Sequence, residues 1–294
     1  MLDFNQRIVL ITGAARGIGL AYARALGARG AHVIVHDAGT DGDGVGRDPD
    51  VAVAAAAMLQ DAGYSAEPAS DVIETREGCR ELVARILARH GRLDSVIHNA
   101  GWVGYQAIDT LTPDFLARAT AIHLNAPAWL AQAAWPAMVA QGHGRILLTT
   151  SDRALYPQYA QAGLAAYAAT KMAAVGLMNA LALEGAPHDI RVNAISPVAK
   201  TRMWGVTEQP TELTPDSVAP GAVFLVSDGC NDSGWILRAS NGQFHAVRAS
   251  EAADVDYPRD IRGVVADSAE TVASHWAEIA PVCAEYRQPQ GATR

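Results

Sequence analysis

A glycine-rich turn between an apolar run and an amphipathic helix, near the start of the chain, limits the fold most narrowly. Residues 8–11, Ile-Val-Leu-Ile, are typical of a strand that is buried on both faces. The turn Thr12-Gly13-Ala14-Ala15-Arg16-Gly17-Ile18-Gly19 follows, and residues 18–29 have the pattern of an amphipathic helix. Glycines let the backbone approach a pyrophosphate, and a helix N-terminus presents N–H groups to it. We therefore predict a dinucleotide site formed by Gly13, Arg16, Gly17, Ile18 and Gly19.

The next apolar run, residues 32–36, ends at Asp37, about twenty residues past the turn. A carboxylate there can accept hydrogen bonds from both ribose hydroxyls of the adenosine, and it repels a 2′-phosphate. We therefore expect NAD as the cofactor, with NADP less favoured, although Arg16 could attract a 2′-phosphate. A further strand leads to Asp71 and Val72, which we add to the cofactor-binding residues. Asp71 could hydrogen-bond the adenine amino group.

Helical and strand patterns alternate through the rest of the first half. Helices are expected over about 50–62 and 75–90, and a strand over 93–98. Such alternation predicts an α/β fold with a doubly wound parallel sheet. With 294 residues, half of them hydrophobic, the chain can build one large domain or two small ones.

Charge and composition exclude several classes of function. The net charge of -8 and the isoelectric point near 5.5 argue against a nucleic-acid-binding protein. Cys79, Cys230 and Cys283 are scattered without metal-ligand spacing, so we expect no metal site and a reducing cytoplasm. No secretory n-region precedes the first strand, and no uninterrupted apolar stretch is long enough to span a bilayer. We expect a cytoplasmic protein with no membrane partner.

The run Tyr167-Ala-Ala-Thr-Lys171 lies in an alanine-rich stretch that favours a helix. A separation of four residues puts the phenol and the ammonium on one helix face. A nearby positive charge lowers a tyrosine pKa, so the pair can act as a general acid/base. The alternative is a half-buried tyrosine beside a surface lysine. Among 23 basic residues the only lysines are Lys171 and Lys200, which favours the catalytic interpretation.

Three motifs occur in the order and at the distances of the short-chain dehydrogenase/reductase family: the glycine turn, Asn99-Ala100-Gly101 and the Tyr167/Lys171 pair. The chain resembles this family over about residues 5–240. The resemblance implies a single Rossmann-type domain with a parallel sheet of about seven strands. It also implies that Asn99 stabilises the central strands and that Gly101 leaves room for the cofactor. His98 replaces the asparagine common before this motif, and we expect only a local packing change there.

The same resemblance implies that Tyr167 and Lys171 also contact the cofactor, with Lys171 holding the nicotinamide ribose, and it assigns further catalytic residues. It implies that Asn125 holds a water that relays protons to Lys171, and that Ser151 hydrogen-bonds the substrate oxygen. Asn125 could instead bond within its own helix, and Thr149 or Thr150 could take the place of Ser151. Ser151 precedes Tyr167 by 16 residues, about three more than is usual in the family, so we expect a lengthened loop that lines the substrate pocket.

The segment from Pro197 to Thr201 resembles the part of the family that closes over the nicotinamide. We expect Pro197, the backbone amide of Val198 and the hydroxyl of Thr201 at the cofactor. Val198 stands where the family usually has glycine. Aromatic and apolar residues that could line a substrate pocket, or belong to the core, are Trp102, Tyr156, Tyr159, Met203 and Trp204.

The tail beyond the last expected strand is longer than a minimal family member needs. We place the dehydrogenase domain at residues 1–242 and a helical extension, with a capped helix near 268–279, at residues 243–294. The tail and the Asp/Gly-rich loop after Asp37 resemble the (3R)-hydroxyacyl-CoA dehydrogenase part of multifunctional enzyme type 2 and its bacterial relatives. That branch suggests a homodimer or homotetramer whose tail packs on a partner subunit; alternatively the tail folds back on its own subunit.

These features predict an oxidoreductase that moves a hydride between NAD and a small secondary alcohol or ketone. Narrower alternatives are a 3-hydroxyacyl-CoA or hydroxysteroid dehydrogenase and an NADPH-dependent ketoreductase. A non-catalytic nucleotide sensor on the same fold is the rival class, and the complete set of catalytic side chains disfavours it.

Overall fold

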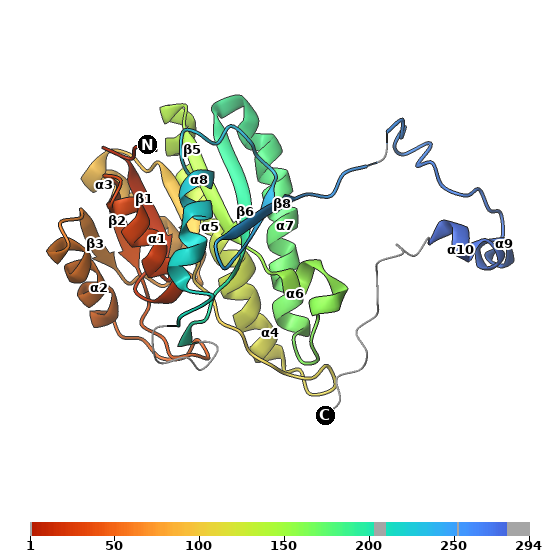
Figure 1. Ribbon diagram of the computed structural model, residues 1–294, viewed down its shortest axis with the longest axis horizontal. Helices are drawn as coiled ribbons and strands as arrows, with labels where there is room; N and C mark the ends of the chain where they lie inside the picture. Colours follow the sequence, from red (N-terminus) through yellow and green to blue (C-terminus); the bar gives the residue numbers. More distant parts are fainter. Residues whose placement is uncertain (1, 203–209, 252, 281–294) are drawn as a thin grey trace. The chain divides into compact units, whose positions relative to one another are not determined.

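The computed structural model describes residues 2–202, 210–251 and 253–280, and its centre is one sheet (Figure 1). The strand order is β3-β2-β1-β4-β5-β6-β7-β8. All neighbours pair in parallel except β7 and β8, which are antiparallel. The strands are β1 Ile8–Thr12, β2 His32–His36, β3 Ala66–Ala69, β4 Ser95–His98, β5 Gly144–Thr149, β6 Ile190–Val198, β7 Ile236–Ser240 and β8 Gln243–Val247.

Helices cover both faces of the sheet, because alternate strand residues point to opposite faces. In β1, Val9 and Ile11 join the core cluster that contains residues of α1, α2 and α8, whereas Ile8 and Leu10 join the cluster that contains residues of α3, α5 and α7. This confirms the doubly wound α/β architecture. The helices and helical turns are α1 Gly17–Gly27, α2 Asp50–Asp61, α3 Arg76–His90, α4 Pro113–Thr120, the π turn η1 Ala121–Asn125, α5 Ala126–Gln141, α6 Asp152–Leu155, η2 Pro157–Tyr159, α7 Ala165–Gly185, η3 Ala186–His188, η5 Pro215–Val218, α8 Ala219–Leu225, α9 Ala269–Ser274 and α10 Trp276–Ile279.

The sheet has eight strands, one more than the approximate number expected. The extra strand, β8, follows β7 through Asn241 and Gly242, both with positive φ angles. A two-residue Asn-Gly connection is the usual signal of a tight hairpin. The predicted domain boundary after residue 242 therefore lies in this turn, and the two compact units of the chain divide after Val247.

The second unit, residues 248–294, contains the two short helices α9 and α10 in the region where one helix was expected. Ser268 is the N-cap of α9, and its side chain accepts a hydrogen bond from the Thr271 N–H. The capping signal was therefore correctly placed, although the helix is broken at His275.

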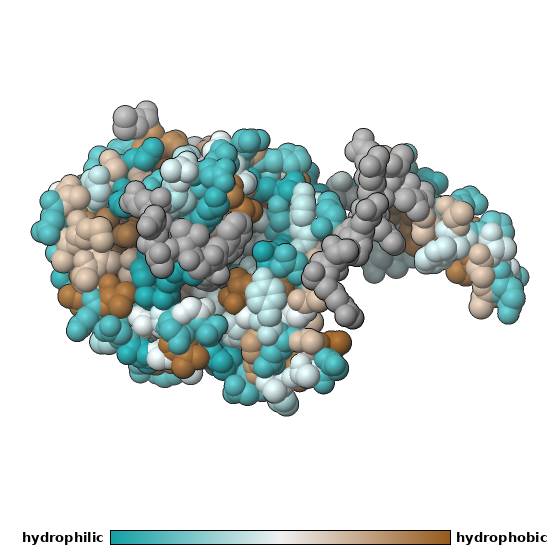
Figure 2. Space-filling view, turned by 60° about the horizontal axis from the view of Figure 1, so that its bottom comes forward, coloured by the Kyte–Doolittle hydropathy of each residue, from teal (hydrophilic) through white to brown (hydrophobic). Residues whose placement is uncertain are grey.

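On the face shown in Figure 2, apolar residues lie in small groups among hydrophilic ones.

Among the described residues, one helix is long and apolar enough to cross a membrane, judged by length and composition only. It is α7 with the turn after it, residues Ala165–His188. We did not expect such a segment from the sequence. Ala166 and Met178 of this helix belong to the core cluster beside the sheet, and a core helix of a folded domain passes the same test.

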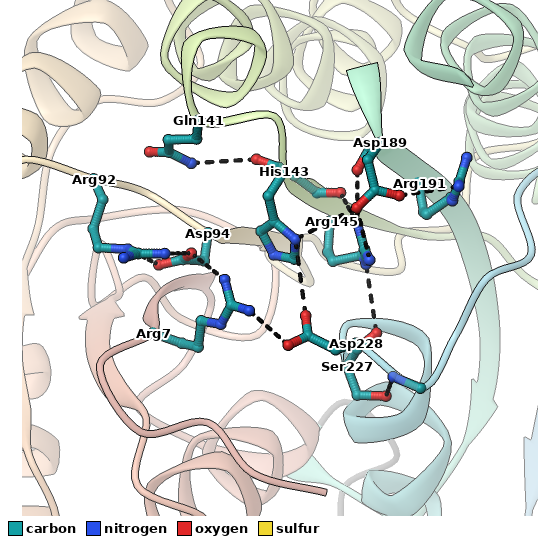
Figure 3. A network of polar contacts seen from close by, with 12 residues as sticks. Arg7, Arg92, Asp94, Gln141, His143, Arg145, Asp189, Arg191, Ser227 and Asp228 are labelled. Carbon is teal, nitrogen blue, oxygen red and sulfur yellow. Dashed lines mark hydrogen bonds and ion pairs between the residues drawn. The ribbon is translucent and has the colours of Figure 1, made fainter. Parts of the chain in front are cut away.

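Charged side chains join the amino ends of the central strands (Figure 3). Arg7 precedes β1, Asp94 precedes β4 and Asp189 precedes β6. Asp94 accepts hydrogen bonds from Arg7 at 3.0 Å, from Arg92 at 2.8 Å and from the Ile8 N–H at 2.8 Å. Burial alone would raise the pKa of Asp94, but the bonds from Arg92, Ile8 and Arg7 hold that pKa below its usual value. The network thus fixes the end of the sheet opposite the glycine turn.

The Asp94→Ala substitution should lower the free energy of unfolding by about 3–5 kcal/mol, because it removes the acceptor of Arg92 and of the buried Ile8 N–H and leaves Arg7 with its exposed partner Asp228. The Asp94 side chain is 1% exposed, whereas that of Asp228, which also pairs with Arg7, is 58% exposed. Asp228→Ala is therefore the control and should cost at most about 1 kcal/mol. Urea unfolding measures both, and equal losses would contradict the structural role of Asp94.

Candidate active site

The glycine turn packs against the loop that follows β4, and only glycine fits at the contact. A Cβ on Gly19 would lie 2.0 Å from the Gly13 carbonyl oxygen, and a Cβ on Gly13 would lie 2.9 Å from Ala100 Cα. The Asn99 side-chain amide donates to the Gly13 carbonyl at 3.0 Å. The N–H groups of Asn99 and Ala100 donate to the Thr12 hydroxyl. Asn99 therefore lies where the resemblance placed it, joining the central strands beside the turn.

A cavity of about 610 Å³ opens beside this turn at the carboxyl ends of the strands. Predicted cofactor residues that line it are Gly13, Arg16, Gly17, Ile18, Asp37, Asn99, Gly101 and Thr201. Gly19, Asp71, Val72, Pro197, Val198 and the pair Tyr167 and Lys171 are not among its lining residues. Gly101 has no space for a side chain, since its Cβ would lie 2.7 Å from His123 Nε2. The cavity therefore brings most of the predicted cofactor residues together.

Asp37 lies in this cavity with its carboxylate held by the backbone. It accepts hydrogen bonds from the Ala15 N–H at 3.1 Å and the Gly39 N–H at 2.9 Å. Arg16 approaches Asp37 to 3.5 Å and donates to the Thr40 carbonyl at 2.9 Å. Arg202 donates to the same carbonyl at 3.0 Å. Burial and the charge of Arg16 lower the pKa of Arg202. Two cations, Arg16 and Arg202, therefore lie near the Asp37 carboxylate.

The Asp71 carboxylate is not positioned for the predicted hydrogen bond to the adenine amino group. Arg85 donates two hydrogen bonds to this carboxylate, at 2.8 Å and 2.6 Å. Asp71 is therefore engaged in an ion pair, and it does not line the cavity. Sequence reasoning could not show this, because the arginine lies on the following helix, α3.

His36 and Glu74 line the cavity instead, and sequence reasoning missed both. The Nδ1 atom of His36 and the Oε2 atom of Glu74 are buried without a hydrogen-bond partner within the described residues. His36 Nε2 lies 3.1 Å from the Asp71 carbonyl, which can only accept, so Nε2 carries the proton and Nδ1 is a free acceptor. Two unsatisfied acceptors in a cavity with a glycine wall fit a bound nucleotide that carries N–H donors.

Tyr167 and Lys171 lie on α7, as predicted. Lys171 is 4% exposed, its Nζ donates to the Thr149 carbonyl at 3.1 Å, and Nζ lies 5.8 Å from the centre of the Tyr167 ring. Burial lowers the pKa of Lys171 to about 8. The alternative of a surface lysine is therefore wrong, and this ammonium remains mostly charged at neutral pH.

Burial also has the largest effect on the pKa of the Tyr167 phenol. Burial raises the pKa of Tyr167, while a hydrogen bond with Ser151 and the charge of Arg153 lower it. The sequence alone predicts that Lys171 lowers the pKa of Tyr167. The Thr149 hydroxyl donates to the His98 carbonyl, and the Thr150 hydroxyl donates to the Lys171 carbonyl, both at 2.8 Å. Ser151 is thus the hydroxyl that reaches Tyr167, and neither threonine takes its place.

The long connection between Ser151 and Tyr167 forms the short helix α6 and the turn η2. Ser151 is the N-cap of α6 and accepts a hydrogen bond from the Arg153 N–H at 3.3 Å. Asp152 accepts hydrogen bonds from Ser196 and Arg238, and Arg238 also lies 4.6 Å from the centre of the Tyr156 ring. These contacts hold Asp152, the residue after Ser151, in place.

Three of the five apolar pocket candidates, Trp102, Tyr156 and Tyr159, lie within the described residues. Trp102 lines the cavity and meets Phe115 edge to face, with ring centres 5.0 Å apart. Tyr156 and Tyr159 contact each other, with ring centres 6.0 Å apart. Met203 and Trp204 lie outside the described residues. Of the three described candidates, Trp102 is therefore the one in the cavity wall.

Asn125 is the last residue of the π turn η1 and is half-buried. None of the contacts described for Tyr167 or Lys171 involves it. His123, two residues earlier, is buried against Tyr167, with ring centres 5.6 Å apart at an interplanar angle of 90°. The relay role of Asn125 stays a prediction, and the polar side chain that contacts Tyr167 from this turn is His123.

The hydrogen bonds of His123 define which ring nitrogen carries the proton. Its Nε2 accepts from the Trp102 N–H at 3.3 Å, so the proton lies on Nδ1, which donates to the Thr170 hydroxyl at 3.1 Å. That hydroxyl donates onward to the Ala166 carbonyl at 2.9 Å. Burial and the charge of Lys171 hold the pKa of His123 well below its usual value. A neutral imidazole therefore links the cavity loop to the catalytic helix.

His98 has a larger role than the local packing change that was expected. Its Nε2–H donates to the Ile122 carbonyl in the π turn at 2.8 Å, and its Nδ1 accepts from the Thr12 hydroxyl at 3.0 Å. Burial, followed by the charge of Lys171, lowers the pKa of His98 to about 3. His98 thus connects the π turn to the glycine turn as a neutral residue.

Comparison with known proteins agrees with this geometry. The family model described as short chain dehydrogenase matches residues 7–211. A Mycobacterium tuberculosis protein described as a short-chain type dehydrogenase/reductase is 32% identical and aligns over 95% of this chain and 96% of its own length. Mouse peroxisomal multifunctional enzyme type 2 is 35% identical over 84% of this chain, but the match spans only 33% of that enzyme. A crystal structure of a short chain dehydrogenase from Mycobacterium avium superimposes with a TM-score of 0.78 at 25% identity, covering 94% of this chain and 95% of that one.

Substitutions at His123 and Asn125 separate their contributions to hydride transfer. His123→Ala should lower turnover by about tenfold or more, because it frees the Tyr167 ring and leaves the Trp102 N–H without an acceptor. His123→Asn retains a donor and an acceptor and should restore part of the loss. The matched variant Asn125→Ala should change turnover less than His123→Ala. Steady-state kinetics measure all three, and a larger loss from Asn125→Ala would support the relay assignment instead.

Proposed function

The chain belongs to the short-chain dehydrogenase family, and on this basis we propose that it interconverts a small secondary alcohol and its ketone with NAD as cofactor. Members of this family are oxidoreductases that act on CH–OH groups with NAD(P). The observation that carries the proposal is the joint position of Ser151, Tyr167 and Lys171 at the carboxyl ends of β5 and its neighbours. The cavity with the glycine turn opens at the same ends of the sheet.

When bound, the nicotinamide supplies or accepts the hydride. Ser151 orients the substrate oxygen, because its hydroxyl already bonds to Tyr167. Tyr167 donates a proton to that oxygen in reduction and accepts one in oxidation. The buried Lys171 ammonium stabilises negative charge as it develops on the phenol. His123 keeps the phenol ring in place.

The substrate is proposed at the level of its reacting group. A 3-hydroxyacyl-CoA or a hydroxysteroid has the required secondary alcohol, and an NADPH-dependent ketoreductase would run the same chemistry toward the alcohol. A nucleotide sensor would not need a buried lysine and a tyrosine joined to a serine hydroxyl. A panel of secondary alcohols tested with both cofactors distinguishes these possibilities.

We also propose that the protein is a cytoplasmic homodimer or homotetramer. Apolar residues exposed within the two described units support an assembly: Met172 and Leu183 on α7, and Val272, Trp276 and Ile279 on α9 and α10. Exposed apolar side chains of this kind are commonly covered by another subunit. Light scattering of the full chain measures the subunit number.

The Tyr167→Phe substitution tests the catalytic proposal. It keeps the ring and removes the proton, so turnover should fall about 10²–10⁴-fold while cofactor binding is retained. Ser151→Ala should behave similarly. Thr150→Val is the matched control, because the Thr150 hydroxyl bonds to a backbone carbonyl and not to Tyr167. Near-normal turnover by the Tyr167→Phe variant would refute the assignment of Tyr167 as the proton donor and acceptor.

Cofactor choice gives a separate prediction. NAD should bind at least about tenfold more tightly than NADP, equivalent to about 1.4 kcal/mol, because the Asp37 carboxylate repels a 2′-phosphate. Asp37→Ala should narrow the difference, whereas Arg16→Ala should widen it by removing a cation that lies within 3.5 Å of Asp37. Fluorescence titration with both cofactors measures the affinities. Equal affinities in the unmodified protein would contradict the role of Asp37.

A further inference from the structure

Two histidines and a glutamate gather at the sheet edge remote from the catalytic residues. His32 is the first residue of β2, Glu67 lies in the neighbouring strand β3, and His90 is the last residue of α3. Asp37 follows the opposite, carboxyl end of β2. The cluster therefore belongs to a different end of the sheet from the cofactor cavity, and none of its members lines that cavity.

The side chains are close enough to share one ligand. One donor atom from each of the three residues lies within 4.8 Å of the others. His90 Nε2 lies 3.0 Å from Glu67 Oε1, and His32 Nε2 lies 3.8 Å from Glu67 Oε2. The two imidazole rings have centres 4.6 Å apart. Three donor groups that suit a transition metal thus converge from three separate elements.

Contacts within the protein leave part of this cluster unsatisfied. His32 Nε2 and Glu67 Oε2 are buried atoms without a hydrogen bond among the described residues, although Arg89 forms an ion pair with Glu67 Oε2 at 3.0 Å. Their separation of 3.8 Å is too long for a hydrogen bond. It is close to the spacing of two ligands around a tetrahedral ion, about 3.4 Å for bonds of about 2.0–2.2 Å.

The surroundings of His32 and Glu67 also suit a metal site. The Nδ1 atom of His32 lies 2.6 Å from the Ser65 hydroxyl, so a hydrogen bond fixes the ring with Nε2 toward Glu67. Metal-binding histidines commonly use their second nitrogen in this way. Arg89 lies 3.0 Å from Glu67 Oε2, but its side chain is 69% exposed and can move away from the carboxylate. Arg89 is therefore a cation that would compete with a metal ion.

We propose that His32, Glu67 and His90 bind one divalent transition-metal ion, with Zn²⁺ as the best match to two imidazole nitrogens and one carboxylate oxygen. A water completes four-coordination. The ion joins β2, β3 and α3 and so stabilises the edge of the sheet. It takes no part in hydride transfer, because the cofactor cavity opens at the other end of the strands. Residues 32, 67 and 90 are too widely spaced to form a sequence motif.

The proposal is tested on the full chain, free of any histidine tag and treated with a chelator. Calorimetric titration with Zn²⁺ should show one ion per chain, and Zn²⁺ should raise the melting temperature. His32→Ala and His90→Ala should each weaken binding at least tenfold, and Glu67→Gln should do the same while keeping an acceptor for His90. Arg89→Ala should bind more tightly than the unmodified protein. His188→Ala, at an exposed histidine outside the cluster, is the control and should not change the affinity.

Circular dichroism and cofactor binding establish that each variant is folded, and Glu67→Gln is the variant that least disturbs packing. Absence of one-to-one binding by the folded, unmodified protein would overturn the proposal. So would equal affinities in the unmodified protein and in a folded Glu67→Gln variant. Turnover in the presence of a chelator should equal turnover with Zn²⁺, and a loss on chelation would contradict the separation of this site from catalysis.

Discussion

The candidate active site contains one buried ammonium, that of Lys171, whose charge reaches the neighbouring histidines. Burial lowers the pKa of Lys171, and its hydrogen bond to the Thr149 carbonyl is the direct contact that offsets this burial. The same charge helps to keep His98 and His123 neutral. Each of these histidines then has one donor and one acceptor nitrogen, and each joins a backbone group in one segment to a threonine hydroxyl in another. Burial, followed by the charge of Lys171, thereby keeps these two histidines neutral.

The two ends of the sheet handle charge in opposite ways. At the amino ends, Asp94 is surrounded by arginines and a backbone N–H, so its charge is neutralised in place. At the carboxyl ends, Lys171 has no carboxylate partner among its described contacts, and His36 and Glu74 keep unsatisfied acceptors. Unpaired buried groups lower stability, and they are useful where a ligand will pair with them. The paired network at one end supports the strands whose other ends form the site.

Local patterns predicted the parts of the structure that depend on local physics. The glycine turn, the alternation of strands and helices, and the Tyr167/Lys171 helix face all follow from periodicity and backbone geometry, and the structure has them at the expected positions. The Asn241-Gly242 turn was a readable hairpin signal, yet β8 was not expected. Sequence could not reveal that Arg85 pairs with Asp71, because that choice depends on how α3 packs.

The π turn explains why His123, and not Asn125, contacts Tyr167. In this turn the Ala126 N–H donates to the Ala121 carbonyl, a step of five residues and not four. The extra residue rotates the helix faces that follow relative to a regular α-helix, so a spacing rule based on 3.6 residues per turn misplaces side chains there. The Ile122 carbonyl in this turn accepts the His98 hydrogen bond. His98 therefore helps to hold the backbone of the turn from which His123 contacts the phenol.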